Sequence, residues 1–121
     1  MASHNDTGKK GELLAVEWLI KHGYDVLHVN WRHSHYEIDM VASKESTLHF
    51  IEVKTRNSLT FGYPEESVSK KKFGSLKNAA EEYLFQHPQW VRVQYDVLSI
   101  TKLKGSPVEF FLIEDVYYSN I

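Results

Sequence analysis

The chain has 121 residues, a length that suits one domain and leaves no room for a second. Apolar residues make up 42% and charged residues 25%, a globular composition that argues against disorder. The 14 Lys and Arg against 16 Asp and Glu give a formal net charge of −2, which excludes a uniformly basic nucleic-acid binder. Any contact with nucleic acid must therefore depend on where the charges lie.

Cysteine is absent, which excludes disulfides, thiolate zinc sites and a cysteine nucleophile. No apolar run approaches the roughly 18 residues that a membrane span needs. The polar start of the chain also lacks the apolar segment of a signal peptide. We expect a single cytoplasmic domain over residues 1–121, with residues 1–7 as a flexible start and no membrane partner.

The first predicted element is a helix over residues 9–22, with a broad apolar face and Gly23 placed as its C-terminal cap. On such a helix Glu12 shares a face with Ala15 and Leu19, at the edge of the buried stripe. A glutamate in the first turns also interacts favourably with the helix dipole, by roughly a few tenths of a kcal/mol. Taken alone, the position of Glu12 is compatible with two roles, either stabilising the helix dipole or forming part of a functional site.

Three strands are predicted next, over residues 24–31, 35–42 and 47–55, with a short polar hairpin link between the last two. In the second strand, strict alternation predicts one face that carries Tyr36, Ile38, Met40 and Ala42. In the third strand, one face is predicted to carry Leu48, Phe50, Glu52 and Lys54.

A polar segment over residues 56–64 precedes a second predicted helix over residues 69–86, where apolar residues recur at helical spacing before Pro88. Two further strands are predicted over residues 91–100 and 108–113. The order αβββαββ predicts an α/β or α+β domain in which one sheet carries two main helices.

Charged residues gather on two neighbouring predicted strands. Alternation places Glu52 and Lys54 on one side of their strand, and the hairpin brings Asp39 close to Glu52 if the register allows. Two adjacent carboxylates repel each other, and a hard cation such as Mg²⁺ compensates them through oxygen ligands. Lys54 could then orient a water or stabilise charge on a phosphate. This set fits hydrolysis of an anionic phosphodiester.

The alternative for Glu52 and Lys54 is an ordinary surface ion pair, worth about 0–1 kcal/mol. Glu-Val-Lys recurs by chance, so the motif alone is weak. Its position favours a site, because Glu12, Asp39 and Glu52 supply three carboxylates from three elements of a small domain.

Several longer motifs follow one another between residues 8 and 100. They include Gly8-Lys-Lys-Gly11-Glu12, Asn30-Trp31-Arg32, Glu37-Ile38-Asp39, Phe50-Ile51-Glu52-Val53-Lys54-Thr55-Arg56, Phe61-Gly62-Tyr63-Pro64 and Tyr95-Asp96-Val97. This succession resembles the YraN-like family, which is similar to Holliday-junction resolvases within the restriction-endonuclease-like, or PD-(D/E)XK, superfamily. The resemblance implies a restriction-endonuclease-like core, with a mixed central sheet flanked by helices.

The resemblance also implies a metal-dependent nuclease centre that acts on DNA. Asp39 and Glu52 would bind Mg²⁺, or Mn²⁺, with the Val53 backbone carbonyl as a further ligand. Lys54 would position or activate the water, and Glu12 would complete the site directly or through a water. By analogy with resolvases, which cut a junction at two symmetric places, a homodimer is a further expectation.

The chain departs from the family pattern in two places. Tyr36 stands where the family usually has glycine, which could change access beside the site, and Gln94-Tyr95 stands where it has Arg-Phe. Neither departure removes a carboxylate.

Positive charge near this centre is expected to contact DNA phosphates, and the residues concerned are Arg56, Lys70, Lys71 and Lys72. A lysine run is more commonly a solvated helix face. Lysines at a helix N-terminus gain nothing from the dipole, however, and Lys72 and Arg56 fall on family motif positions.

Two histidines, His33 and His35, lack a third ligand and are interpreted as part of a polar turn. Two functional classes then remain open. One is a Mg²⁺-dependent endonuclease-like enzyme that acts on DNA, including branched or damaged DNA. The other is a nucleic-acid-binding or DNA-repair accessory module that keeps the fold and the acidic pocket without turnover.

Overall fold

The computed structural model describes residues 4–57 and 70–116, and their side chains over residues 10–57 and 74–116. The elements in chain order are α1 (His4–Lys21), β1 (Asp25–His33), β2 (Tyr36–Lys44), β3 (Thr47–Arg56), α2 (Lys70–Gln86), β4 (Arg92–Thr101) and β5 (Glu109–Ile113). This order confirms the predicted αβββαββ arrangement of an α+β domain. None of the described helices is long and apolar enough to cross a membrane.

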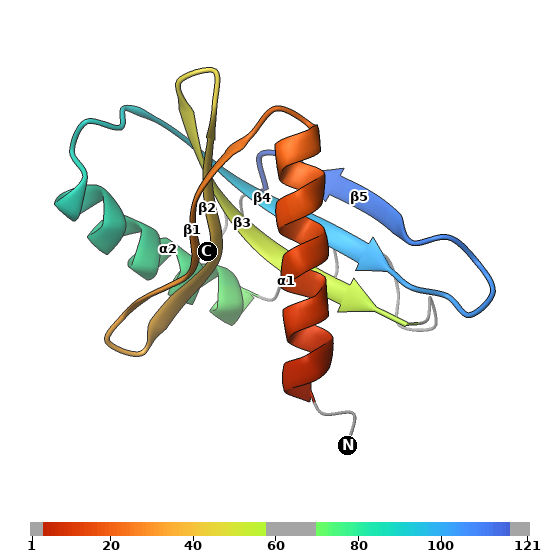
Figure 1. Cartoon of the computed structure of the whole chain (residues 1–121). Helices are drawn as coiled ribbons and strands as arrows, with labels where there is room; N and C mark the ends of the chain where they lie inside the picture. Colours follow the sequence, from red (N-terminus) through yellow and green to blue (C-terminus); the bar gives the residue numbers. More distant parts are fainter. Residues whose placement is uncertain (1–3, 58–69, 117–121) are drawn as a thin grey trace.

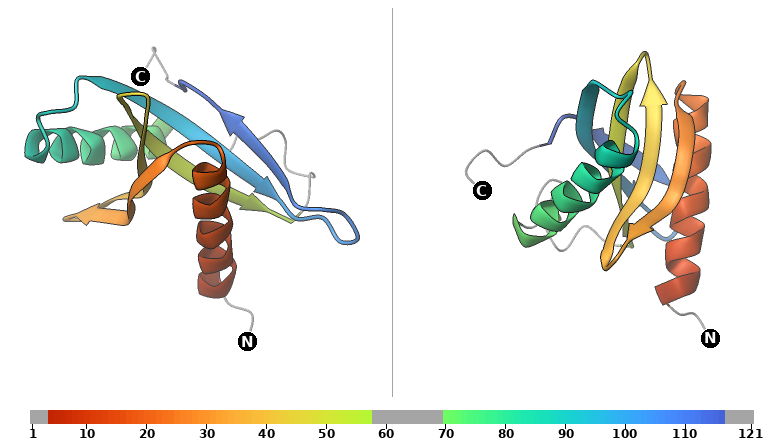
Figure 2. Two further views of the ribbon diagram at one scale, coloured as in Figure 1. Left: turned by 45° about the horizontal axis from the view of Figure 1, so that its top comes forward. Right: turned by 90° about the vertical axis from the view of Figure 1, so that its left-hand side faces the viewer.

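The five strands form one mixed sheet in the order β1-β2-β3-β4-β5 (Figure 1). Neighbouring strands are antiparallel except β3 and β4, which are parallel and are connected through α2. A parallel pair needs such a crossover, because a tight turn joins only antiparallel strands. Helices α1 and α2 lie on opposite faces of the sheet (Figure 2).

The core is divided by the sheet into two apolar clusters. On the α2 side, Phe50 packs with Leu76 and Tyr83, and on the α1 side, Ile51 packs with Leu19. The alternation predicted for β3 is therefore correct, since its odd and even apolar residues enter different clusters.

The alternation predicted for β2 is wrong in part. Met40 and Ala42 lie in the α1-side cluster, but Ile38 packs with Val41 on the α2 side. Strict alternation requires a regular strand, and β2 is irregular here. Its ladder with β3 ends at Met40, and the neighbouring strand β1 carries Asn30 with a φ of 53°.

Helix α1 ends as the sequence predicts. Gly23 has a φ of +90°, a conformation that glycine adopts without a steric penalty. The backbone N–H of Tyr24 donates to the carbonyl of Leu19 at 2.9 Å, which satisfies one of the last helical carbonyls. The chain then turns directly into β1.

Gly11 lies where α1 crosses β3, and we expect Gly11→Ala to destabilise the fold by about 1–3 kcal/mol. An added Cβ would stand 2.4 Å from Thr55 Oγ1, which outweighs the gain of up to about 1 kcal/mol in helix propensity. Chemical denaturation measures the change. Gly74→Ala is the matched control, because nothing lies within 4 Å of an added Cβ there and it should stabilise the protein. Adding Thr55→Ala should recover most of the loss, and equal stabilities for the two alanine variants would contradict the prediction.

Candidate active site

The candidate site lies where β2 separates from β3. The β2–β3 ladder extends from Lys44–Thr47 to Met40–Ile51, whereas β3 continues beside β4 as far as Arg56–Thr101. Asp39 and Glu52 are the next residues on the two strands after the last pair. Beyond Ile51, β3 therefore keeps a partner strand on one side only, and backbone groups on the other side face the departing β2.

One of those backbone groups is bound by Asp39. The backbone N–H of Val53 donates to Asp39 Oδ2 at 2.9 Å, in place of the ladder bond that a continuing β2 would have made. A hydrogen bond from a backbone amide to a carboxylate is charge-assisted and short. Asp39 is thus fixed against the middle of the Glu52–Lys54 segment.

Glu52 and Lys54 point to the same face of β3, the α2 side. Glu52 is 6% exposed, and its Oε1 lies 3.6 Å from Lys54 Nζ. A carboxylate buried to this extent requires a partner, and the ammonium supplies one. The Lys54 side chain is 23% exposed, so it is the more accessible member of the pair.

Glu12 reaches the same corner of the fold from α1. Its Oε1 accepts a hydrogen bond from Asn30 Nδ2 at 2.7 Å. Asn30 lies opposite Asp39 in the β1–β2 ladder, between the pairs Val29–Met40 and Trp31–Ile38. Within the described residues, no three His, Asp or Glu side chains gather closely enough to hold a metal ion directly.

Sequence reasoning missed Asn30 as a site residue. The available signals were its place in the Asn30-Trp31-Arg32 motif and the tolerance of asparagine for positive φ. Its distant partner could not be read from the sequence, because the contact depends on how α1 packs against β1.

Ser99 was missed as well. It is paired with Lys54 across the parallel β3–β4 ladder and is 1% exposed. Among the described residues, its Oγ has no hydrogen-bond partner. Its place across the ladder from Lys54 puts Ser99 beside the candidate site.

Of the basic residues expected to meet DNA, Arg56 continues the face of Glu52 and Lys54 at the end of β3. The residues Lys70, Lys71 and Lys72 begin α2, but their side chains lie outside the described part of the chain. The two histidines flank a turn at Ser34, whose φ is 57°, as the sequence predicts. His33 Nε2 lies 3.7 Å from Glu82 Oε1.

The arrangement of strands and helices is that of the restriction-endonuclease-like fold. A solved Holliday junction resolvase from the archaeal hyperthermophile Archaeoglobus fulgidus has a similar structure, with a TM-score of 0.51. The match covers 85% of this chain and 74% of that chain at 22% sequence identity. The fold class predicted from the motifs is thereby confirmed.

The family follows from the sequence comparisons. Residues 11–100 match the family described as Uncharacterised protein family UPF0102, and the chain belongs to it. A UPF0102 protein of Flavobacterium psychrophilum is 41% identical over 119 residues, which are 98% of each chain. A UPF0102 protein of Caldicellulosiruptor bescii is 42% identical over 113 residues, 91% of this chain and 95% of that one. The YraN-like assignment is confirmed.

Proposed function

We propose that this protein is a divalent-metal-dependent endonuclease that hydrolyses phosphodiester bonds in DNA. The observation that carries the proposal is the corner where β2 leaves β3. There Asp39 is fixed by the Val53 N–H, and the largely buried Glu52 lies 3.6 Å from the Lys54 ammonium. The two carboxylates can bind a divalent cation. That cation, together with the ammonium, would neutralise charge on both a nucleophile and a phosphoryl group.

The donor set fits Mg²⁺ or Mn²⁺. Its atoms are the carboxylate oxygens of Asp39 and Glu52 and the Val53 carbonyl, which points to the same side of β3 as the Val53 N–H. All are hard oxygen ligands, and Mg²⁺ commonly uses only one or two carboxylates and keeps several waters. When bound, the ion would supply a Lewis acid and an acidified water. Glu12, held by Asn30, suits a contact through one of those waters.

The side chains of the site are proposed to have different roles in binding and catalysis. Asp39 and Glu52 would hold the cation through their negative charge. Lys54 is accessible enough to hydrogen-bond the attacking water or a phosphoryl oxygen. Arg56, further along the same strand face, is proposed to bind a neighbouring phosphate, and Lys70, Lys71 and Lys72 extend this proposal along the start of α2.

A second candidate function is a DNA-binding or repair-accessory module that keeps the fold without turnover. One observation favours it, namely that no three acidic or histidine side chains converge within the described residues. Cleavage assays with linear, flapped and four-way DNA in Mg²⁺ or Mn²⁺ separate the two functions. Metal-dependent cutting supports the enzyme, whereas salt-sensitive binding without cutting supports the module. Absence of both would overturn both.

The substrate proposal is branched or damaged DNA, because the structural neighbour is named a Holliday junction resolvase. We also propose that the protein acts as a cytoplasmic homodimer, because two symmetric cuts in a junction suit a two-fold assembly. Sedimentation with and without four-way DNA tests the dimer. A monomer on the junction at saturating protein would contradict it.

We expect Ser99→Ala to be more stable than the native protein, by about 0.5–2 kcal/mol, yet slower in cleavage. The substitution removes a buried hydroxyl that has no partner among the described residues, which favours the folded state. It also removes a polar group beside Lys54, which weakens the site. Thermal unfolding and single-turnover cleavage measure the two effects. Unchanged cleavage by the stabilised variant would contradict a role in the site.

A further inference from the structure

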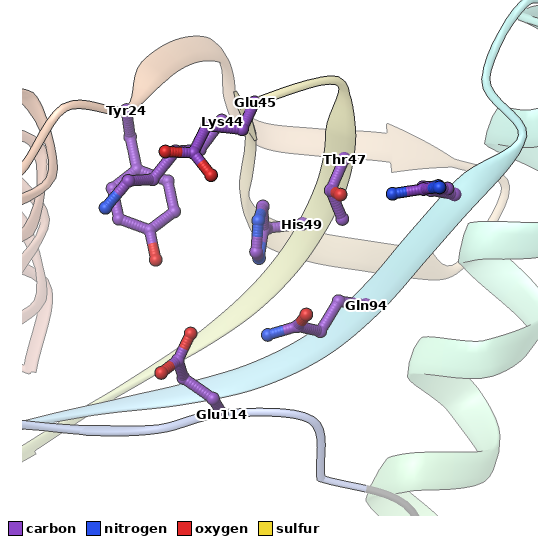
Figure 3. Close-up of a pocket in the computed structure, with 8 residues that line it drawn as sticks. Tyr24, Lys44, Glu45, Thr47, His49, Gln94 and Glu114 are labelled. Atoms are coloured by element: carbon purple, nitrogen blue, oxygen red, sulfur yellow. The ribbon is translucent and has the colours of Figure 1, made fainter.

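A polar cavity of about 320 Å³ lies at the other end of the sheet, where β3 and β4 begin (Figure 3). It is lined by His49 on β3, whereas Lys54 lies roughly 17 Å further along that strand. His49 and Lys54 also point to opposite faces of the sheet. The cavity is therefore separate from the candidate active site, and its volume is that of a small-molecule pocket.

The floor of the cavity is formed by His49, whose ring is paired with the buried carboxylate of Asp96 behind it. His49 is 5% exposed, and its Nδ1 lies 2.7 Å from Asp96 Oδ2. Asp96 Oδ1 accepts two more hydrogen bonds, from Gln94 Nε2 and from the backbone N–H of Asp115, both at 2.9 Å. An ionised carboxylate only accepts, so the imidazole donates from Nδ1 and leaves Nε2 as the group that can meet a ligand.

A second buried group faces the same space. Tyr24 is 6% exposed and meets the His49 ring edge-on, with the ring centroids 5.1 Å apart. Burial, together with the nearby carboxylates of Asp96 and Glu114, raises the pKa of Tyr24 to about 12. Its hydroxyl therefore stays protonated at neutral pH and can donate to a ligand. Figure 3 shows Tyr24 and His49 turned toward the space that Gln94 and Glu114 close from the other side.

The wall above this floor carries charges of both signs. Lys44 and Arg92 are cationic, and Glu45 and Glu114 are anionic. Lys44 is held in place, with Nζ 4.8 Å from the centre of the Tyr24 ring. A simple anion would meet two carboxylates here, and a simple cation would meet two positive side chains. An apolar ligand would leave the polar floor without partners.

We propose that this cavity binds a small zwitterion, a molecule with one ammonium and one carboxylate such as a free amino acid. Its ammonium would pair with His49 Nε2 and the Glu114 carboxylate, and its carboxylate with Lys44 or Arg92. The Tyr24 hydroxyl would donate to the ligand carboxylate. This site does not depend on the nuclease proposal, and either one can fail while the other stands.

The test is a nuclear magnetic resonance titration of the whole, ¹⁵N-labelled chain with each common amino acid. We expect at least one to cause saturable shifts that involve Tyr24, His49 and Gln94. For that amino acid, the matched amine without the carboxylate and the matched acid without the ammonium should each bind at least about tenfold more weakly. Equal binding of either analogue, or no saturable shift with any amino acid, would overturn the proposal.

Substitutions at the exposed charged residues that line the cavity, here called the rim, locate the site without disturbing the buried His49–Asp96 pair. Arg92→Gln and Glu114→Gln should each weaken binding about fivefold to tenfold. Glu109→Gln, an exposed glutamate on β5 away from the cavity, is the matched control and should bind as the native protein does. Native affinity in both rim variants would contradict the assigned contacts.

Discussion

Replacing Lys54 with methionine is expected to reduce metal-dependent DNA cleavage by about 10²- to 10³-fold. It should also lower stability, because the buried Glu52 carboxylate loses its ammonium partner. Lys54 Nζ lies 3.6 Å from Glu52 Oε1, so the ammonium stands where charge would develop on the substrate or its attacking water. Methionine keeps most of the aliphatic stem and removes only the charge. Single-turnover cleavage of flapped and four-way DNA measures the loss.

Asp39→Asn should lose as much cleavage, for a different reason. The asparagine carbonyl can still accept from the Val53 N–H, but the neutral amide no longer compensates a cation. Binding of Mn²⁺ should therefore fall in Asp39→Asn and persist in Lys54→Met. This difference distinguishes a metal ligand from a residue that acts on the water or phosphate.

Lys104→Met is the matched control for charge, because Lys104 is exposed in the turn between β4 and β5. It should cleave at the native rate. Native rates in Lys54→Met would contradict the assigned role, even if the wild-type protein proves to be a nuclease. Loss of cleavage in both lysine variants would point instead to a general effect of net charge on DNA binding.

The local parts of this fold could be predicted from the sequence, because they depend on neighbours along the chain. Helical spacing and the glycine at position 23 located α1, and alternation assigned the faces of β3 around Phe50 and Ile51. Alternation failed in β2 at Ile38. There the strand leaves β3, and a positive φ at Asn30 distorts its other neighbour. The alternation of side chains along a strand cannot predict such an irregularity, because it assumes a regular strand.

The partners of the site residues could be predicted less well from the sequence, because long-range packing determines them. The Glu-Val-Lys segment was visible as a motif, but the contact of Asp39 with the Val53 N–H requires the ladder to end at Met40. Ser99 comes beside Lys54 only through the parallel register of β3 and β4. The pairing of His49 with Asp96 depends on the same register. Asp96 belonged to a recognised motif, yet nothing local indicated that it was buried.

Asp96→Ala is expected to destabilise the protein by about 3–5 kcal/mol, the largest effect on stability among the substitutions considered. Asp96 is 1% exposed and accepts hydrogen bonds from His49, Gln94 and the backbone of Asp115. Alanine would leave these donors without their acceptor, and the desolvation penalty of each remains. Urea denaturation measures the free energy of unfolding.

Asp96→Asn tests whether hydrogen bonding or charge accounts for this loss. The asparagine carbonyl can keep one donor, and His49 can present its other tautomer to the amide, so we expect a smaller loss of about 1–3 kcal/mol. Glu109→Ala, on the exposed side of β5, should change stability by less than about 0.5 kcal/mol. An alanine variant at position 96 as stable as Glu109→Ala would contradict the structural role. If Asp96→Ala instead unfolds more easily but cleaves DNA normally while folded, the buried pair supports the cavity and the β3–β4 core rather than the candidate active site.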